Sequence, residues 1–221
     1  MGFTLNDVTA VTLFYKTEDL INLSIKSFRK YYPTIQMVIV DNSGGDDCTI
    51  ALRDFVSNDN YSTLIETGSN LGHGIGLDVG IKSSNSKLIY IFESDVFMKV
   101  PGLIEELISM VKDNTYGVSE IHWVTYDKPF SDVSRDFIER KKMRYVWIYA
   151  GLLSKDKYLE FPPLGNDQKT NAFPIGEAMR SVHDKGDDEL LVDFDLSKYV
   201  THLYGGTRCK YGIGGEGNYV N

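Results

Sequence analysis

The sequence predicts a single α/β domain built on a mainly parallel, doubly wound sheet. Two observations lead to this prediction: buried strands alternate with amphipathic helices through the first hundred residues, and polar turn residues follow each strand. The chain has 221 residues, a length that suits one such domain. Right-handed crossovers would bring the strand ends at Tyr15, Asp41, Thr67 and Asp95 to one edge of the sheet.

The first strand and helix have clear local signals. Residues 8–15 form a short β-prone run, and Thr17 then supplies a helix start with acids in the first turn. Apolar residues recur at near-helical spacing over about 18–31 until Pro33 ends the helix. Residues 35–40 are predicted to be a second buried strand.

The next units repeat this order. A glycine-rich turn closes the second strand, and Asp46 opens a helix that extends to about Val56. Residues 62–66 are predicted to form a third strand. A glycine-rich loop covers 68–76, and the helix that follows it is expected over about 75–83.

The fourth strand, residues 87–98 with the sequence KLIYIFESDVFM, is the most informative segment. An apolar run bounded by polar residues is typical of a fully buried strand in a parallel sheet. This run leads into Glu93 and Asp95, separated by Ser94. Acids at the carboxyl end of such a strand can hold a hard divalent cation together with a substrate phosphate. Alternatively, they only begin a loop and cap the next helix.

Beyond residue 98 the pattern is looser. The predicted segments are a helix over 103–111, a strand over 117–126, a polar and charged segment over 127–144, an apolar segment over 146–154, a loop over 161–173 and a glycine-rich tail over 205–221.

Composition argues against several functional classes. Lysine and arginine total 23 against 31 acids, so the net charge of −8 provides no overall attraction for nucleic acid or anionic membranes, although a local basic patch could. Cys48 and Cys209 lie far apart and indicate neither a disulfide framework nor a metal-ligand pair. No signal peptide is evident, and no apolar run approaches the roughly 20 residues that span a bilayer. We expect a soluble, cytoplasmic protein without a transmembrane segment.

The order of these motifs resembles the GT-A glycosyltransferases, in particular the large inverting family 2 that uses nucleotide-diphosphate sugars. The likeness rests on VTAVTLFYK, IQMVIVDNSGGDD, GSNLGHGIGLDVGIKSS, YIFESDVFM, YAGLLSK and YVTHLYGGT, in that order. It is specific over residues 8–98 and diffuse over 100–200. The resemblance implies a GT-A fold in which 1–98 form the nucleotide-sugar-binding half, and 99–204 the acceptor-binding half, of one domain.

The resemblance also implies a nucleotide site at the ends of the first strands. Phe14 and Tyr15 occupy the place of the family's threonine–tyrosine pair beside the base, so an aromatic surface replaces the threonine hydrogen bond. Asp41 matches an aspartate that hydrogen-bonds the base, and a carboxylate can accept the ring N–H of uracil, thymine or guanine. Asp41 could instead simply close an Asx turn.

The glycine-rich loop and its helix resemble the family's Asn-x-Gly segment, which assigns Asn70, Gly72 and Asp78 to nucleotide binding. Glycines let the backbone approach a ligand, and a helix N-terminus suits an anion. A Rossmann dinucleotide loop fits poorly, because the glycine spacing is wrong and the loop follows the third strand. His73 is either a ligand or a loop histidine.

Glu93-Ser94-Asp95 occupies the place of the family's DxD motif, with glutamate in place of the first aspartate. The resemblance implies that Asp95 and Glu93 coordinate Mn²⁺ or Mg²⁺ bridging the donor's phosphates, with Ser94 beside the nucleotide. His202 resembles a C-terminal histidine that some members add to the metal shell, and an imidazole ligand favours Mn²⁺ over Mg²⁺. Alternatively, His202 closes a lid over the phosphates or is structural.

Inverting transfer needs a carboxylate that takes the proton from the acceptor hydroxyl. Family 2 carries this base in a Glu-Asp or similar pair at a helix start. The nearest match is Glu177 in GEAMR, with Asp167 in reserve, although no Glu-Asp pair occurs there. Either acid could instead be a solvated surface residue.

Two further groups lie in the second half of the chain. A basic cluster is either a solvated helix face or a platform for an anionic acceptor; it comprises Arg135, Arg140, Lys141, Lys142 and Arg144. Tyr145, Trp147 and Tyr149 alternate along the next predicted strand, where they either stack on a sugar or base or belong to the core.

Together these features predict a metal-dependent, inverting glycosyltransferase with a UDP-, dTDP- or GDP-sugar donor. The acceptor is left open among a glycan, a lipid-linked sugar, a protein and a modified nucleobase. A nucleotidyltransferase that makes nucleotide sugars would need a glycine-rich, basic signature where FYKTED stands. A non-catalytic binding module would be favoured by loss of both Glu93 and Asp95, but both are present.

Overall fold

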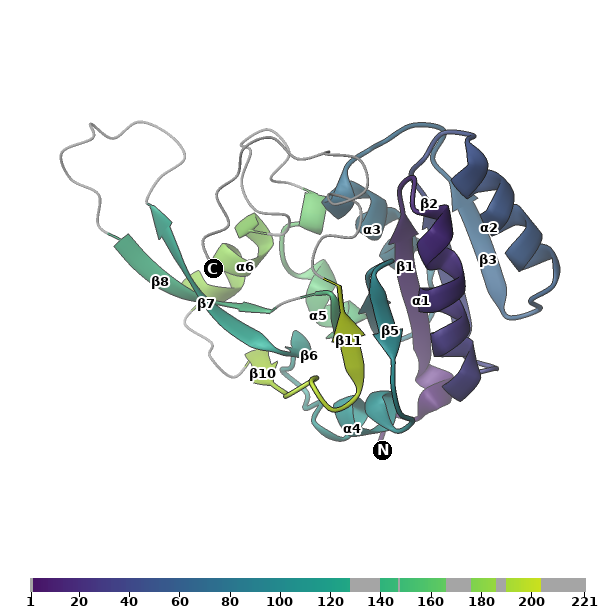
Figure 1. The fold of residues 1–221 in the computed structure, drawn as a ribbon. Coiled ribbons are helices and arrows are strands. Elements are labelled where there is room, and N and C mark those ends of the chain that lie inside the picture. Colours follow the sequence, from purple (N-terminus) through teal and green to yellow (C-terminus); the bar gives the residue numbers. More distant parts are fainter. Residues whose placement is uncertain (1, 128–139, 147, 166–175, 186–189, 204–221) are drawn as a thin grey trace.

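A computed structural model describes residues 2–127, 140–146, 148–165, 176–185 and 190–203, which form a central sheet with helices on both faces (Figure 1). A short 3₁₀ helix, Leu5–Asp7, precedes the first strand. Within the described ranges, no helix is both long and apolar enough to cross a membrane.

The central sheet has seven strands in the order β10-β6-β9-β4-β1-β2-β3. They are β1 (Val8–Phe14), β2 (Gln36–Asp41), β3 (Ser62–Glu66), β4 (Leu88–Phe92), β6 (Gly117–Ser119), β9 (Ala150–Ser154) and β10 (Leu191–Asp193). Strands β3, β2, β1 and β4 run parallel to one another, as β10 does to β6, whereas β9 is antiparallel to both of its neighbours. The predicted mainly parallel α/β sheet is confirmed.

Helices cover both faces of this sheet. One face packs against α1 (Glu18–Tyr31), α2 (Asp47–Ser57) and α4 (Leu103–Ser109), and the other against α3 (His73–Ser83), α5 (Lys155–Leu159) and α6 (Gly176–Asp184). Strand β4 contributes to both cores, because Tyr90 and Phe92 point to the first face and Ile89 and Ile91 to the second. Burial on both sides explains why its sequence is continuously apolar.

Local signals explain the elements of the first half. In α1 the residues Ile21, Ile25 and Phe28 form the buried stripe that its periodicity predicts. The Asp46 side chain accepts hydrogen bonds from the amides of Cys48 and Thr49, and so caps α2. The structure confirms the predicted helix over 18–31 and strand over 62–66 at their predicted bounds.

The second half departs from the prediction at Glu120. The segment 117–126, predicted as one strand, is divided there into β6 and β7 (Ile121–Asp127). Strand β7 leaves the central sheet and pairs with β8 (Arg140–Val146) in a two-stranded ribbon that extends away from the body (Figure 1). The basic residues from Arg140 to Arg144 therefore lie on a strand and not on a helix, whereas Arg135 lies outside the described residues.

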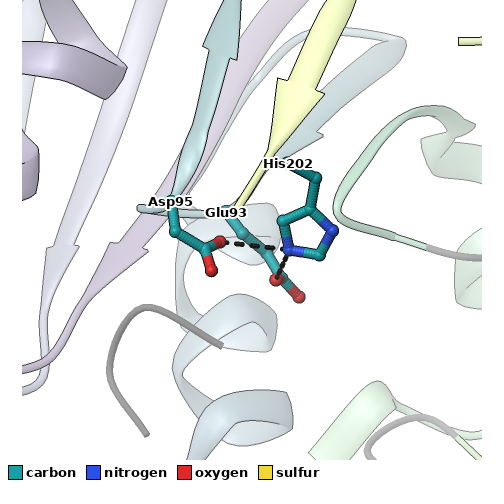
Figure 2. Close-up of side chains that lie close together, drawn as sticks. All are labelled: Glu93, Asp95 and His202. Atoms are coloured by element: carbon teal, nitrogen blue, oxygen red, sulfur yellow. Dashed lines mark ion pairs between the residues drawn. The ribbon is translucent and has the colours of Figure 1, made fainter. Parts of the chain in front are cut away.

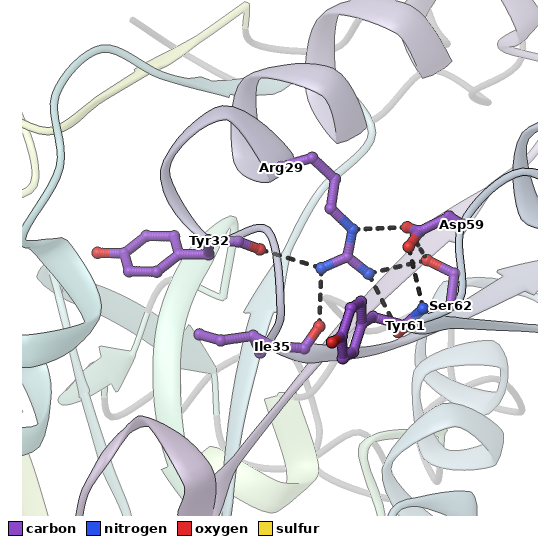
Figure 3. A network of polar contacts seen from close by, with 6 residues as sticks. All are labelled: Arg29, Tyr32, Ile35, Asp59, Tyr61 and Ser62. Carbon is purple, nitrogen blue, oxygen red and sulfur yellow. Dashed lines mark hydrogen bonds and ion pairs between the residues drawn. The ribbon is translucent and has the colours of Figure 1, made fainter.

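At the amino ends of β2 and β3, Arg29 of α1 ties three segments together (Figure 3). Its guanidinium forms an ion pair with Asp59, with 2.6 Å between Nε and Oδ2, and both side chains are almost buried. Its other donors reach the carbonyls of Tyr32, Ile35 and Tyr61 and the hydroxyl of Ser62. Arg29 thus satisfies backbone acceptors where α1 meets the two strands.

We expect Arg29→Met to lower the free energy of unfolding by about 3 kcal/mol, because it removes the charge partner of the largely buried Asp59 carboxylate and the donor to the carbonyls of Tyr32 and Ile35. Arg53→Met is the matched control: its pair with Glu66 is 2.6 Å long but exposed to solvent, so its loss should lower the free energy of unfolding far less than Arg29→Met does. Urea denaturation measures both values, and equal losses would contradict this role for Arg29.

Candidate active site

The candidate site lies where the parallel strands β1, β2, β3 and β4 end. The register places Phe14 opposite Asp41, and Asp41 opposite Glu66. Backbone hydrogen bonds continue just past the strands: Asn42 N donates to Phe14 O at 2.9 Å, and Thr67 N donates to Asp41 O at 3.0 Å. The carboxyl ends therefore meet at one edge, as predicted.

Glu93, Ser94 and Asp95 form the turn between β4 and a short strand β5 (Val96–Met98), and not the end of one long strand. The amide of Val96 closes this turn on the carbonyl of Glu93 at 3.1 Å, and Glu93 N donates to Tyr149 O at 2.8 Å. Both Ser94 and Asp95 are buried. The backbone around the two acids is thus fixed on both sides.

His202 reaches the acids through a second strand pairing. Strand β11 (Val200–His202) is antiparallel to β5 and places His202 opposite Val96. Its Nε2 lies 3.2 Å from Asp95 Oδ1 and 3.4 Å from Glu93 Oε2 (Figure 2). The ligand atoms of the three side chains all lie within 4.8 Å of one another. The structure therefore brings together the three predicted metal ligands.

The two carboxylates determine the charge of His202. Burial lowers the pKa of His202, but hydrogen bonds to Asp95 and Glu93 and the charges of both acids raise it, and the net result is about 9 instead of 6.5. In the absence of another cation, His202 is therefore an imidazolium at neutral pH. The cluster attracts positive charge, and this proton competes with any metal ion.

Two residues outside the predicted metal-ligand set border the trio. His73, the first residue of α3, has its Nε2 3.6 Å from Glu93 Oε1. The ring of Tyr149 stacks on the His202 imidazole, with centroids 4.6 Å apart and planes inclined by 9°. The place of His73 in the predicted glycine-rich loop was a usable sequence signal. No local sequence feature links Tyr149 to His202.

The two aromatic residues at the end of β1 differ in accessibility. Phe14 is fully buried in the core on the α1 and α2 side, whereas Tyr15 is only partly buried. A nucleotide base would have to displace core packing to reach Phe14. Tyr15 is therefore the better placed of the two, and contact of either with a base stays a prediction.

Asp41 is 1% exposed, and its carboxylate is engaged by its own turn. Oδ1 accepts the amide of Ser43 at 2.8 Å, and Oδ2 accepts the hydroxyl of Thr49. The bond to Ser43 is the one that an Asx turn makes, and the bond to Thr49 adds a contact with α2. Recognition of a base by Asp41 stays a prediction.

Asn42, the residue after β2, organises the neighbouring loop. Its amide nitrogen donates to Asn70 Oδ1 at 3.0 Å and to Gly72 O at 3.3 Å, and its Oδ1 accepts the amide of Leu71 at 2.9 Å. Gly72 has a φ of 86°, a conformation that favours glycine, and directly precedes α3. Asn70 and Gly72 thus shape the loop that leads into this helix.

Asp78 joins α3 to the segment after α5. Its carboxylate, in a residue only 4% exposed, accepts the hydroxyl of Tyr158 and the amides of Leu164 and Gly165. Close packing of α3 on β1 explains the glycine at position 76, because a Cβ there would lie 2.0 Å from Leu13 Cδ1. These contacts are structural, and a contact of Asp78 with a nucleotide stays a prediction.

The predicted catalytic base and one of the predicted stacking aromatics belong to the second half of the chain. Glu177 is the second residue of α6, and Asp167 and Trp147 lie outside the described residues. The identity of the catalytic base stays a prediction.

Comparisons with known proteins identify the family. The family model described as glycosyl transferase family 2 matches residues 9–172. Among solved structures, a mannosyltransferase from Pyrobaculum calidifontis in complex with GDP-Man and Mn²⁺ superposes with a TM-score of 0.60 at 16% identity, over 85% of this chain and 54% of that one. TarS 1–349 from S. aureus in complex with UDP gives 0.60 at 12% identity, over 87% and 59%. A search of curated proteins finds no match.

This chain spans little more than half the length of these two structures, and likeness at such low identity shows the fold alone. Both share the GT-A architecture seen here, with its mainly parallel central sheet. Because the family model covers most of the sequence, the chain belongs to glycosyl transferase family 2 and has the GT-A fold.

Proposed function

We propose that this protein is a metal-dependent, inverting glycosyltransferase that moves a sugar from a nucleotide-diphosphate donor to an acceptor hydroxyl. The observation that carries this function is the convergence of Glu93, Asp95 and His202 at the carboxyl edge of β4, in a chain of family 2. One structural neighbour was solved in complex with GDP-Man and Mn²⁺ and another in complex with UDP, which supports a nucleotide-sugar donor.

The three side chains fit a divalent cation. Two carboxylates and one imidazole, with ligand atoms within 4.8 Å of one another, are oxygen and nitrogen donors that suit Mn²⁺ better than Mg²⁺. Glu93 and Asp95 lie in the turn before β5, and His202 lies on β11, which pairs with β5. The three candidate metal ligands are therefore largely preorganised. A cation held there would act as a Lewis acid that stabilises the departing nucleoside diphosphate.

The chain's own residues would bind and orient the donor around this centre. Tyr15 and Asp41 are proposed to face the base, and Ser94 the nucleotide. The loop of Asn70 and Gly72 leads into the N-terminus of α3, which favours anionic groups of the donor. UDP, dTDP and GDP are the proposed nucleotides.

Transfer with inversion also needs a base for the acceptor hydroxyl. Glu177 at the start of α6 is the proposed base, with Asp167 as the alternative. Membership in family 2 favours sugar transfer over nucleotide-sugar synthesis, and turnover of a nucleotide sugar would separate transfer from binding alone. A glycan, lipid-linked sugar, protein or modified nucleobase remains the proposed range of acceptors.

Nucleotide binding should depend on the metal and on Asp95. We expect one of UDP, dTDP, GDP and CDP, at about 100-fold excess over Kd, to raise the melting temperature by about 5 to 10 °C when Mn²⁺ is present. Asp95→Asn should abolish the Mn²⁺-dependent part of this shift, while Asp113→Asn, at an exposed position, should retain it. An equal shift in wild type and Asp95→Asn would contradict the metal site.

The protonation of His202 should be visible in stability. Its pKa rises from 6.5 to about 9 on folding, which corresponds to about 3 kcal/mol of stabilisation in the metal-free protein. This stabilisation is complete below pH 6.5 and is lost as the pH rises through 9, because only the imidazolium pairs with the carboxylates. Urea denaturation of wild type and His202→Gln should therefore differ most near pH 6 and least above pH 9. A difference that does not change with pH would refute the ion pair.

A further inference from the structure

We propose that Tyr149 is a positioning residue of the candidate metal site and that Glu120 holds Tyr149 in place. Neither residue belongs to the proposed ligand set. This role rests on the proposed function, because it concerns the same metal site, and it adds to that site a support built from the opposite half of the sheet.

Tyr149 contacts two of the three candidate ligands in different ways. Its ring lies parallel to the His202 imidazole at 4.6 Å, and its backbone carbonyl accepts the amide of Glu93 at 2.8 Å. It is itself 4% exposed and directly precedes β9, which pairs with β4. One residue thus links the turn that carries the acids to the histidine on β11.

The stacked ring restricts how the imidazole can turn. His202 Nε2 lies 3.2 Å from Asp95 Oδ1 and 3.4 Å from Glu93 Oε2, and a parallel aromatic face on one side disfavours rotations that tilt the imidazole out of this plane. Residues that orient a metal ligand in this way contribute to metal affinity although they never touch the metal.

Glu120 fixes the other end of the tyrosine. It directly follows β6, where the chain leaves the central sheet, and its Oε2 accepts the Tyr149 hydroxyl at 2.5 Å. A carboxylate is a stronger acceptor for this hydroxyl than a neutral group. The hydroxyl of Ser119 donates to Ala150 O at 2.8 Å, so the backbones that carry the pair are also held together. The contacts therefore run from Glu120 through Tyr149 to His202.

The test measures the Kd of Mn²⁺ alone, by electron paramagnetic resonance titration of free Mn²⁺, for wild type and variants. We expect Tyr149→Phe and Glu120→Ala each to weaken binding by about tenfold, the lower end of the range for supporting residues. The double variant should be no weaker than Tyr149→Phe, because Glu120 acts through the hydroxyl that this substitution removes. Glu120→Gln should weaken binding less than Glu120→Ala, since its amide oxygen still accepts the hydroxyl, although less strongly than a carboxylate.

Two control variants separate this role from general effects. Tyr116→Phe removes a buried hydroxyl that has no hydrogen-bond partner among the described residues, and should leave the Kd unchanged. His122→Asn alters the other neighbour of Glu120, whose Nε2 lies 3.1 Å from Glu120 Oε1, and should also have no effect. A loss in His122→Asn equal to that in Glu120→Ala would overturn the path through Tyr149.

Wild-type Kd values in folded Tyr149→Phe and Glu120→Ala would overturn the positioning role while leaving the metal site intact. Additive losses in the double variant would show that Glu120 acts by another route. Failure of wild type itself to bind Mn²⁺ would overturn the proposed metal site and this role with it. Glu120 is about one-third exposed, so Glu120→Ala tests the role even where Tyr149→Phe disturbs folding.

Discussion

The antiparallel pairing of β5 with β11 is the constraint on which the candidate site depends. Parallel strands of the central sheet bring Glu93 to the carboxyl edge, but parallel pairing alone would leave two acids in a turn. The short ladder places His202 opposite Val96 and so beside Asp95. In the metal-free protein, the His202 imidazolium partly neutralises the negative charge of Glu93 and Asp95, which a bound divalent cation would otherwise neutralise. Backbone hydrogen bonds thus place the three residues together, and the His202 side chain then pairs with both acids.

Much of the first half could be predicted from sequence because its signals are local. Helical periodicity and the acids after Thr17 give the bounds of α1, and burial on both faces makes β4 recognisable as one apolar run. The division of residues 117–126 at Glu120 could not be predicted, since it depends on which partner each half pairs with, β9 or β8. The strand position of the basic residues of β8 could not be predicted for the same reason, and the solvated helix face offered as one alternative is wrong.

The candidate site shows the same limit at the level of side chains. The motif order placed Glu93, Asp95 and His202 in one cluster, and the structure confirms their proximity. The contacts of Tyr149 with His202 and Glu120 join residues far apart in sequence, so no spacing reveals them. The residue type does not decide the role of Asp41 either, because an aspartate at this position suits both an Asx turn and a contact with a nucleotide base.

The central claim is that the acids and His202 hold a cation that also binds the donor diphosphate. Pulsed electron paramagnetic resonance of Mn²⁺ bound to the protein with the most stabilising nucleoside diphosphate tests it directly. We predict nitrogen-14 coupling from His202 together with phosphorus-31 coupling from the diphosphate, and loss of the nitrogen signal alone in His202→Gln. A spectrum identical to that of the Mn²⁺–nucleotide complex free in solution would contradict the account.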